Sequence, residues 1–220
     1  MTHNDSHYTP GGKIIKPSLE FTCTANFGRS PPAESKARME LRSYGLENKY
    51  TVRSSGTLVD VIKSGNVPEK MMIGTINLWL SGDHASYAMG KKIEQVINDH
   101  DTNKIQEYFR LAVIELNAEE RKHREEAIKN FGIKDTIKET QEQTIARPET
   151  IAIYSMSESN AQVVAALYER AGFAVKPLMK TLDVPDGFGK GRDAYFASIE
   201  SLLKQVTHEM TQLLIQRGDI

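Results

Sequence analysis

The chain contains a single cysteine, Cys23, so no disulfide can form within it. A lone thiol favours a reducing compartment, and we expect a cytoplasmic protein. No apolar run is long enough to cross a bilayer, because the most apolar window, 71–80, is short and interrupted. Residues 1–12 are polar and lack the apolar segment of a secretory signal peptide. We therefore expect a loose N-terminal tail and no membrane partner.

Neither sign of charge dominates. Lys and Arg total 28 and Asp and Glu total 29, which gives a formal net charge of −1. Nucleic-acid binding depends on a basic excess that displaces counterions from phosphates, so we expect no nucleic-acid partner. Hydrophobic residues make up 39% of the chain and charged residues 26%, which is typical of a globular protein with a buried core.

The hydrophobic pattern predicts alternating strands and helices. Runs rich in β-branched and aromatic residues predict strands at 18–23, 49–53, 150–155 and 174–179. Helical spacing predicts helices at 33–45, 161–171 and 193–216. This order predicts an α/β fold, with a central four-stranded parallel sheet flanked by helices and 150–155 as a central strand.

Residues 62–112 differ from the rest because their apolar residues follow helical spacing only. We interpret them as an all-helical insertion in an α/β domain formed by 13–61 and 113–220. The insertion carries the only tryptophan, Trp79, and is expected to be a cap or an interaction module, with a homodimer as one option. The charged run 119–129 is interpreted as the solvated face of a helix that ends at Gly132.

The chemistry of the chain is concentrated in residues 23–30, between the first predicted strand and the first predicted helix. Successive main-chain N–H groups in such a loop can surround an anion, and the helix N-terminus adds positive potential. The same field favours the thiolate of Cys23, which is the nucleophilic form. Arg29 offers planar paired donors for phosphate oxygens, and Ser30 can donate a hydrogen bond to the sulfur. The alternative is a buried structural cysteine beside an unrelated surface arginine.

These residues resemble the low-molecular-weight protein-tyrosine phosphatases, whose loop is Cys-x-x-Asn-x-x-Arg-Ser-Pro. Cys23, Asn26, Arg29, Ser30 and Pro31 match that loop. Further similarity lies at Ala33-Glu34, Ser54-Ser55-Gly56-Thr57, Gly132-Ile133, Met156-Ser157-Glu158-Ser159-Asn160 and Val184-Pro185-Asp186. The resemblance covers roughly 18–61 and 128–216, and leaves the predicted insertion outside it.

The resemblance implies the roles of the site residues. Cys23 attacks phosphorus, Arg29 binds the phosphate, and Asp186 acts as general acid and then as base. The phosphate-binding loop is completed by Thr24, Ala25, Asn26, Phe27, Gly28 and Ser30. Ser54 supports the loop, and Phe188 lines the leaving-group pocket. No metal or cofactor is implied. From its residue context alone, Asp186 is better interpreted as an ordinary turn aspartate than as a general acid, and Asp183 is the second candidate for the acid.

Three departures from the family pattern matter. Gly187 follows Asp186 where the family has proline, which predicts a more mobile acid loop. Gly28 replaces a second loop cysteine, so oxidation of Cys23 would pass through the sulfenic acid. The single cysteine also argues against an arsenate reductase of this fold, which needs further cysteines.

A bulky side chain at the position of Phe27 favours aryl phosphates in the resembling enzymes, whereas arginine-phosphate enzymes have threonine there. The expected substrate is therefore phosphotyrosine in a protein, or a small aryl phosphate. A packing role beneath the loop is the alternative for Phe27. The alternative for the whole chain is a catalytically weak or inactive phosphate-binding or scaffolding relative.

Overall fold

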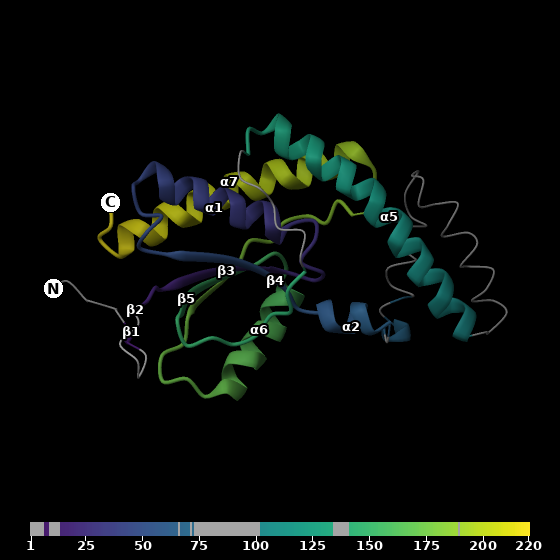
Figure 1. Ribbon diagram of the computed structural model, residues 1–220, viewed down its shortest axis with the longest axis horizontal. Helices are drawn as coiled ribbons and strands as arrows, with labels where there is room; N and C mark the ends of the chain where they lie inside the picture. Colours follow the sequence, from purple (N-terminus) through teal and green to yellow (C-terminus); the bar gives the residue numbers. More distant parts are fainter. Residues whose placement is uncertain are drawn as a thin grey trace. The chain divides into compact units, whose positions relative to one another are not determined.

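The computed structural model describes residues 7–8, 14–65, 67–70, 72, 102–133, 141–188 and 190–220. Its centre is a parallel sheet in the order β4-β3-β5-β6, so the predicted four-stranded parallel sheet is confirmed (Figure 1). The strands are β3 (Ser18–Cys23), β4 (Thr51–Gly56), β5 (Thr150–Ser155) and β6 (Leu178–Thr181). β5 is an interior strand, as its continuous apolar run predicts.

The described helices are α1 (Ser30–Ser43), α2 (Val59–Ser64), α5 (Thr102–Asn130), α6 (Glu158–Ala171) and α7 (Arg192–Gln216). A separate two-stranded antiparallel ladder pairs β1 (His7–Tyr8) with β2 (Ile14–Ile15). The ends of α6 show why it forms where it does. The Ser157 side chain caps its N-terminus by accepting from the N–H of Asn160, and Gly172 ends it with a φ of 65°.

Two strands, β4 and β6, differ from the sequence prediction at both ends. β4 continues through Gly56, three residues beyond the expected end, because Ser54 and Ser55 stay in register with Phe21 and Thr22 of β3. These serines suggest a turn by their type, yet both are buried and hydrogen-bonded. β6 begins at Leu178 instead of residue 174, since its ladder with β5 spans only four pairs.

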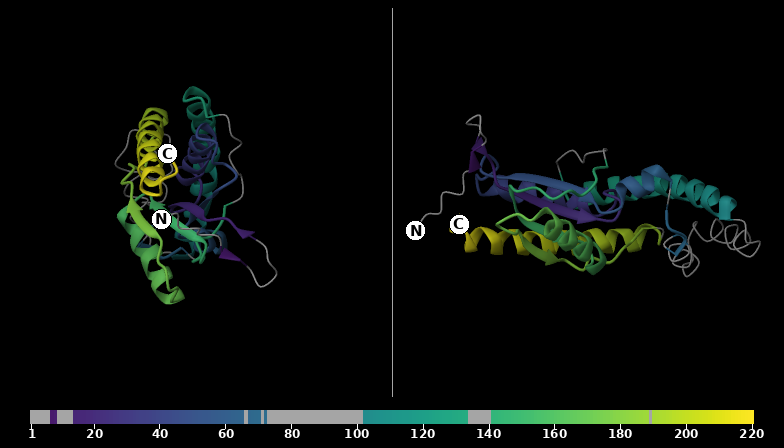
Figure 2. Two further views of the ribbon diagram at one scale, coloured as in Figure 1. Left: turned by 90° about the vertical axis from the view of Figure 1, so that its left-hand side faces the viewer. Right: turned by 90° about the horizontal axis from the view of Figure 1, so that it is seen from below.

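Helices cover both faces of the sheet (Figure 2). α1 packs over β3 and β4, and α7 lies beside it, where Thr207 donates a hydrogen bond of 2.8 Å to Glu40 of α1. α6 covers the opposite face through Val164 and Tyr168, which pack on Ile153 of β5. The two faces of the sheet therefore contribute to separate layers of the core.

The C-terminus is tied to the segment that precedes β4. Asp219, whose side chain is almost fully buried, accepts hydrogen bonds from Lys49 and from the Tyr50 hydroxyl. Arg217 in turn donates to that hydroxyl at 2.9 Å. This cluster closes one end of the α/β layers.

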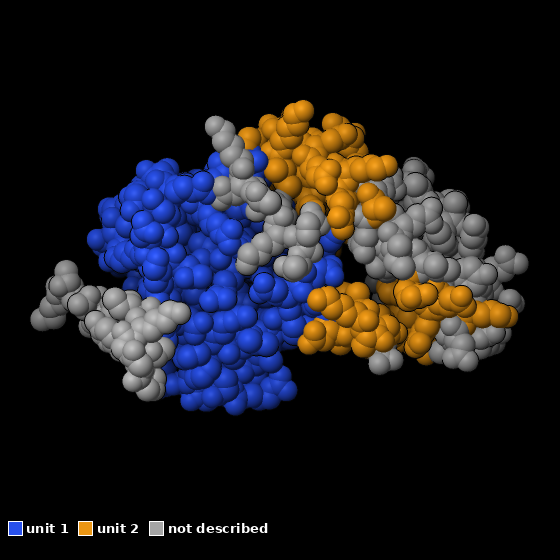
Figure 3. Space-filling model, in the orientation of Figure 1, with its two compact units in different colours: residues 1–59, 133–184, 201–220 blue, residues 60–132, 185–200 orange. Residues whose placement is uncertain are grey.

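The chain divides into two compact units (Figure 3). The first comprises Met1–Val59, Ile133–Val184 and Ser201–Ile220, and the second comprises Asp60–Gly132 and Pro185–Glu200. Within the second unit, the start of α7 packs on the end of α5, with Phe131 and Phe196 at 6.0 Å between ring centroids. Arg192 adds an exposed ion pair of 2.7 Å with Glu126.

α5 includes the end of the segment 62–112, where helical spacing is expected, and continues without a break into the charged run. That run is not wholly a solvated face, because Arg124 and Ala127 are buried. Much of the predicted insertion, including Trp79, lies outside the described residues. Of the helices that are described, none combines the length and apolarity needed to span a bilayer.

Candidate active site

The predicted loop connects the end of β3 to the start of α1. The main-chain N–H groups of Thr57 and Leu58 donate to the carbonyls of Cys23 and Thr24, at 2.8 and 3.0 Å. In a planar trans peptide the carbonyl and the following N–H point in opposite directions. The N–H groups of Thr24 and Ala25 therefore point away from the segment after β4.

Asn26 gives the loop its curvature. Its φ of 50° lies in the left-handed region, which asparagine adopts more readily than most residues. A left-handed residue among right-handed ones turns successive N–H groups toward a common point, which is the geometry of an anion-binding nest. The Asn26 side chain holds this bend by donating a hydrogen bond of 3.3 Å to the carbonyl of Ser54.

The sulfur of Cys23 lies 3.1 Å from the hydroxyl oxygen of Ser30, and both side chains are buried. The Ser30 hydroxyl is also 2.9 Å from Asn26 Oδ1 and 3.1 Å from the carbonyl oxygen of Ser55. Since a hydroxyl has only one proton, these acceptors compete for it. When Cys23 is a thiolate, its negative charge makes it the strongest acceptor of the three. The arrangement can therefore stabilise negative charge on sulfur.

Arg29 occupies the N-cap position of α1 and is buried. Its guanidinium donates a hydrogen bond of 3.0 Å to the carbonyl of Val184, in the segment that follows β6. The bond holds this arginine at the end of the loop. It also links the loop to the stretch of chain that leads to Asp186.

Ser54 is hydrogen-bonded both to the loop and to α1. Its carbonyl accepts from Asn26, and its hydroxyl donates to the buried carboxylate of Glu34 on α1. Glu34 is also paired with Arg38 one turn further along the helix. In the sequence, Glu34 was only a motif match, and its contact with Ser54 depends on how α1 packs on β4.

Gly56 was not among the predicted site residues, yet it lies directly against the loop. A Cβ at this position would be 2.6 Å from the main-chain N of Asn26 and 2.8 Å from the carbonyl carbon of Ala25. Real Cβ atoms essentially never come so close to main-chain atoms. Glycine is therefore required here for close approach between β4 and the loop.

Asn160 is a second residue that the sequence analysis did not assign to the site. It is buried, and its side-chain amide donates to the hydroxyls of Thr57, at 3.0 Å, and Thr24, at 3.4 Å. Ser157 donates back to Asn160 Oδ1 at 2.8 Å. The start of α6 is thus bonded to the first loop residue after the nucleophile. The Met-Ser-Glu-Ser-Asn motif was the available signal.

The remaining loop residues are Phe27 and Gly28. Phe27 is only 8% exposed, and the loop carries it among the buried residues of the core. Such burial is what a packing role requires, so its effect on substrate choice stays a prediction.

Asp186 and Phe188 belong to the second unit. The N–H of Phe188 donates to the Asp186 carboxylate at 3.2 Å, and Ser198 donates to the carbonyl of Pro185 at 2.6 Å. Gly187 fits tightly on α7, since a Cβ there would be 2.7 Å from the Cα of Tyr195. These contacts hold 185–188 against the start of α7, whereas the missing proline predicts a mobile loop.

The second candidate acid, Asp183, is exposed and has a φ of 49°. Across the described ranges, no group of three or more His, Cys, Asp and Glu side chains is arranged to hold a metal ion. The donors at the loop are main-chain N–H groups, a guanidinium and hydroxyls, which suit an anion.

Neither protein-family models nor curated protein sequences match the chain. Solved structures do match. YwlE, an arginine phosphatase of Bacillus subtilis, is 18% identical over 92% of this chain and 99% of its own, with a TM-score of 0.54. Wzb of Vibrio vulnificus, in complex with benzylphosphonate, is 13% identical over 90% and 99%, with a TM-score of 0.52. The low-molecular-weight phosphotyrosine phosphatase VcLMWPTP-2 of Vibrio cholerae is 15% identical over 92% and 99%, with a TM-score of 0.51.

The chain therefore has the fold of the low-molecular-weight protein tyrosine phosphatases, and the resemblance drawn from the motifs is confirmed. At these identities the likeness concerns the fold alone. The chemistry depends on the residues of the site.

Proposed function

We propose that the chain is a cysteine-dependent phosphatase that hydrolyses phosphotyrosine in proteins, or other aryl phosphates, through a phosphocysteine intermediate. The observation that carries the proposal is the 3.1 Å contact between Cys23 Sγ and Ser30 Oγ in a loop of anion-binding geometry. A buried structural cysteine would not need a hydroxyl partner shared with Asn26, nor an arginine at the adjoining helix cap.

In the first step, the thiolate of Cys23 attacks phosphorus. The S–P bond forms and the P–O bond to the leaving group breaks while Asp186 gives its proton to the leaving oxygen. The charge on the phosphoryl oxygens is met by the loop N–H groups and by Arg29. In the second step, water loses a proton to Asp186 and attacks phosphorus. The S–P bond breaks, and the departing thiolate receives the hydrogen bond of Ser30.

The Val184-Pro185-Asp186 motif supports Asp186 as the acid. Arg29 holds the carbonyl of Val184, which lies between the two candidate acids in the sequence. Asp183 comes directly before Val184, and its side chain is exposed. The main chain next to Asp183 is held by a hydrogen bond of 2.8 Å from the N–H of Leu182 to the carbonyl of Ser155.

An arginine phosphatase is the second candidate. YwlE is named as an arginine phosphatase, and its TM-score is at least as high as that of the phosphotyrosine phosphatase VcLMWPTP-2. The fold thus accommodates both substrates. Phe27 favours the aryl substrate, as does the aromatic ligand of Wzb.

The compartment is proposed from the cysteine content. A single reactive thiol favours a reducing compartment such as the cytoplasm.

Turnover of an aryl phosphate tests the proposal. We expect wild-type activity that is sensitive to vanadate and is lost in Cys23→Ser. If wild type binds vanadate without any turnover, the chain is a phosphate-binding module instead. Comparing kcat/KM for a phosphotyrosine peptide and a phosphoarginine peptide then separates the two substrates, and preference for phosphoarginine would refute the aryl assignment.

The acid is tested with two leaving groups. Asp186→Ala should slow a phosphotyrosine peptide by about 100-fold, because a phenol leaves poorly without a proton. An aryl phosphate with a good leaving group should be slowed far less. Asp183→Ala is the matched control and should leave both rates unchanged. Equal loss on both substrates in Asp186→Ala would rule out the acid role.

A further inference from the structure

Glu20 is a buried acid in the middle of β3, three residues before the nucleophile. It is 0% exposed, and none of the proposed catalytic steps uses it. It lies on the α6 face of the sheet, because it pairs with Ile153, whose side chain packs on α6. A charged residue inside a parallel sheet costs free energy unless its hydrogen bonds are satisfied, so its partners indicate its purpose.

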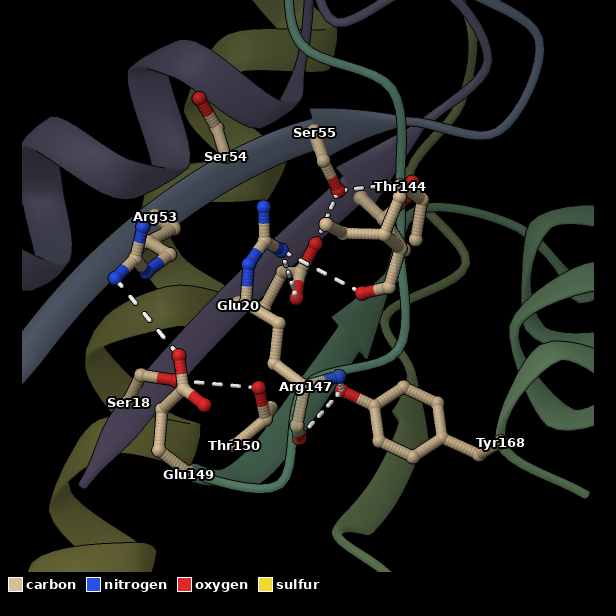
Figure 4. Close-up of polar contacts among 12 residues, drawn as sticks. Ser18, Glu20, Arg53, Ser54, Ser55, Thr144, Arg147, Glu149, Thr150 and Tyr168 are labelled. Atoms are coloured by element: carbon tan, nitrogen blue, oxygen red, sulfur yellow. Dashed lines mark hydrogen bonds and ion pairs between the residues drawn. The ribbon is translucent and has the colours of Figure 1, made fainter. Parts of the chain in front are cut away.

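Two side chains satisfy Glu20 (Figure 4). The Ser55 hydroxyl donates to one carboxylate oxygen, and Arg147 donates to the other at 3.4 Å. Burial raises the pKa of Glu20, while the hydrogen bond from Ser55 and the charge of Arg147 act in the opposite direction. Ser55 also lies 2.8 Å from the hydroxyl of Thr144, which in turn lies 3.0 Å from that of Thr22.

Residues 141–149 bring Arg147 and Thr144 to this face. Gly56 N–H donates to Glu142 O at 2.8 Å, and Thr144 N–H donates to Gly56 O at 2.9 Å, so the segment is bonded along the end of β4. The Tyr168 hydroxyl of α6 accepts from the N–H of Arg147 at 3.1 Å and donates to its carbonyl at 3.3 Å. Arg147 is therefore fixed at its main chain as well as at its side chain.

Ser55 joins this buried cluster to the catalytic loop. Its side chain binds Glu20, and its carbonyl oxygen accepts the Ser30 hydroxyl at 3.1 Å. Ser30 is in turn 3.1 Å from the Cys23 sulfur. The Ser55 carbonyl therefore helps to set where the Ser30 oxygen lies, and a shift of Ser55 would move this oxygen relative to the sulfur.

We propose that Glu20 and Ser55 are positioning residues for the nucleophile: Glu20, held by Arg147, fixes Ser55, and Ser55 fixes the hydroxyl of Ser30 toward the Cys23 thiolate. This inference rests on the proposed phosphatase function for its consequence in turnover. The positioning itself is a property of the folded chain and is measurable without turnover.

Alkylation of Cys23 by iodoacetamide tests the positioning directly, because the chain has no other thiol. In Ser55→Ala the alkylation rate at about pH 6 should fall at least severalfold, since the thiolate loses a well-placed donor. Ser18→Ala is the matched control. Ser18 is buried on the same face of β3, and its hydroxyl pairs with Thr150 at 3.1 Å, far from the loop (Figure 4). Ser18→Ala should lose thermal stability to a similar degree and alkylate at the wild-type rate.

Glu20 is tested by loss and rescue. Glu20→Leu should lower the alkylation rate as Ser55→Ala does, whereas Glu20→Gln keeps an oxygen acceptor for Ser55 and should restore most of it. Wild-type alkylation in Ser55→Ala would overturn the proposal. So would a fall in Ser18→Ala as large as in Ser55→Ala, because the effect would then be general loosening of the sheet.

Turnover provides a second readout. In Ser55→Ala, breakdown of phosphocysteine should slow more than its formation, so a burst of released phenol should appear, and kcat should fall more than kcat/KM. Absence of turnover in wild type would refute the proposed function. The alkylation rates would still decide the positioning.

Discussion

Gly56→Ala is the sharpest test of the loop geometry. The new Cβ would lie 2.6 Å from the main-chain N of Asn26, where ordinary contacts begin at 3.4 Å. Gly56 cannot retreat, because its N–H and carbonyl are both bonded to residues 142 and 144. The loop must therefore move by about 0.8 Å, which is the overlap between these distances.

A displacement of this size has a predictable cost. Overpacking of a tight interior position destabilises by about 1–3 kcal/mol, which would appear in urea denaturation. A misplacement near 1 Å in a catalytic constellation costs on the order of 100-fold in rate. We expect kcat for an aryl phosphate to fall by about that factor in Gly56→Ala, with a weaker affinity for vanadate.

Val59→Ala provides the control. Its Cγ2 atom is the one side-chain atom among the three nearest neighbours of the new Cβ, at 2.7 Å, while the other two are main-chain atoms of the loop. Adding Val59→Ala to Gly56→Ala should relieve some instability without restoring turnover. A Gly56→Ala enzyme with wild-type stability and kcat would refute the close approach of β4 to the loop.

Two further predictions concern buried hydrogen bonds. Asn160→Ala removes the donor to Thr24 and Thr57, so the free energy of unfolding in urea should fall by about 1–3 kcal/mol and kcat should also fall. Asn160→Gln retains an amide and tests how strictly the position of that amide is set. Burial would raise the pKa of Asp219, but the hydrogen bonds that it accepts from Lys49 and Tyr50 outweigh this effect, so its pKa is lowered overall. A lowered pKa contributes stability above the unfolded value of 3.8 that is lost as pH falls through the folded value. Asp219→Asn should therefore be less stable than wild type by about 1 kcal/mol at neutral pH, a difference that disappears in acid denaturation curves; a pH-independent difference would contradict the assignment.

Local sequence accounts for the loop and the elements on either side of it. Cys23, Asn26, Arg29 and Ser30 lie within eight residues, so their spacing alone places them on one turn between a strand and a helix. The structure agrees because both the left-handed conformation of Asn26 and the proline-rich start of α1 are local preferences.

The second layer of the site could not be predicted in the same way. Ser54 and Ser55 suggest a turn by residue type, and only pairing with β3 reveals them as a strand whose hydroxyls and carbonyls hold the loop. Gly187 suggested mobility because glycine is locally permissive. Its packing on Tyr195 adds a second role, because the lack of a side chain allows close approach.

The sequence by itself determined the order of strands and helices, the parallel sheet and the position of the loop 23–30 between a strand and a helix, because hydrophobic period and turn chemistry act over a few residues. Tertiary structure alone decided what surrounds that loop. Glu20, Gly56, Arg147 and Asn160 are separated by up to 140 residues in the chain, and their hydrogen bonds and close contacts to distant residues exist only once the strands are paired. Long-range contacts of this kind leave no periodic signal, since each depends on the position of a backbone that other residues set.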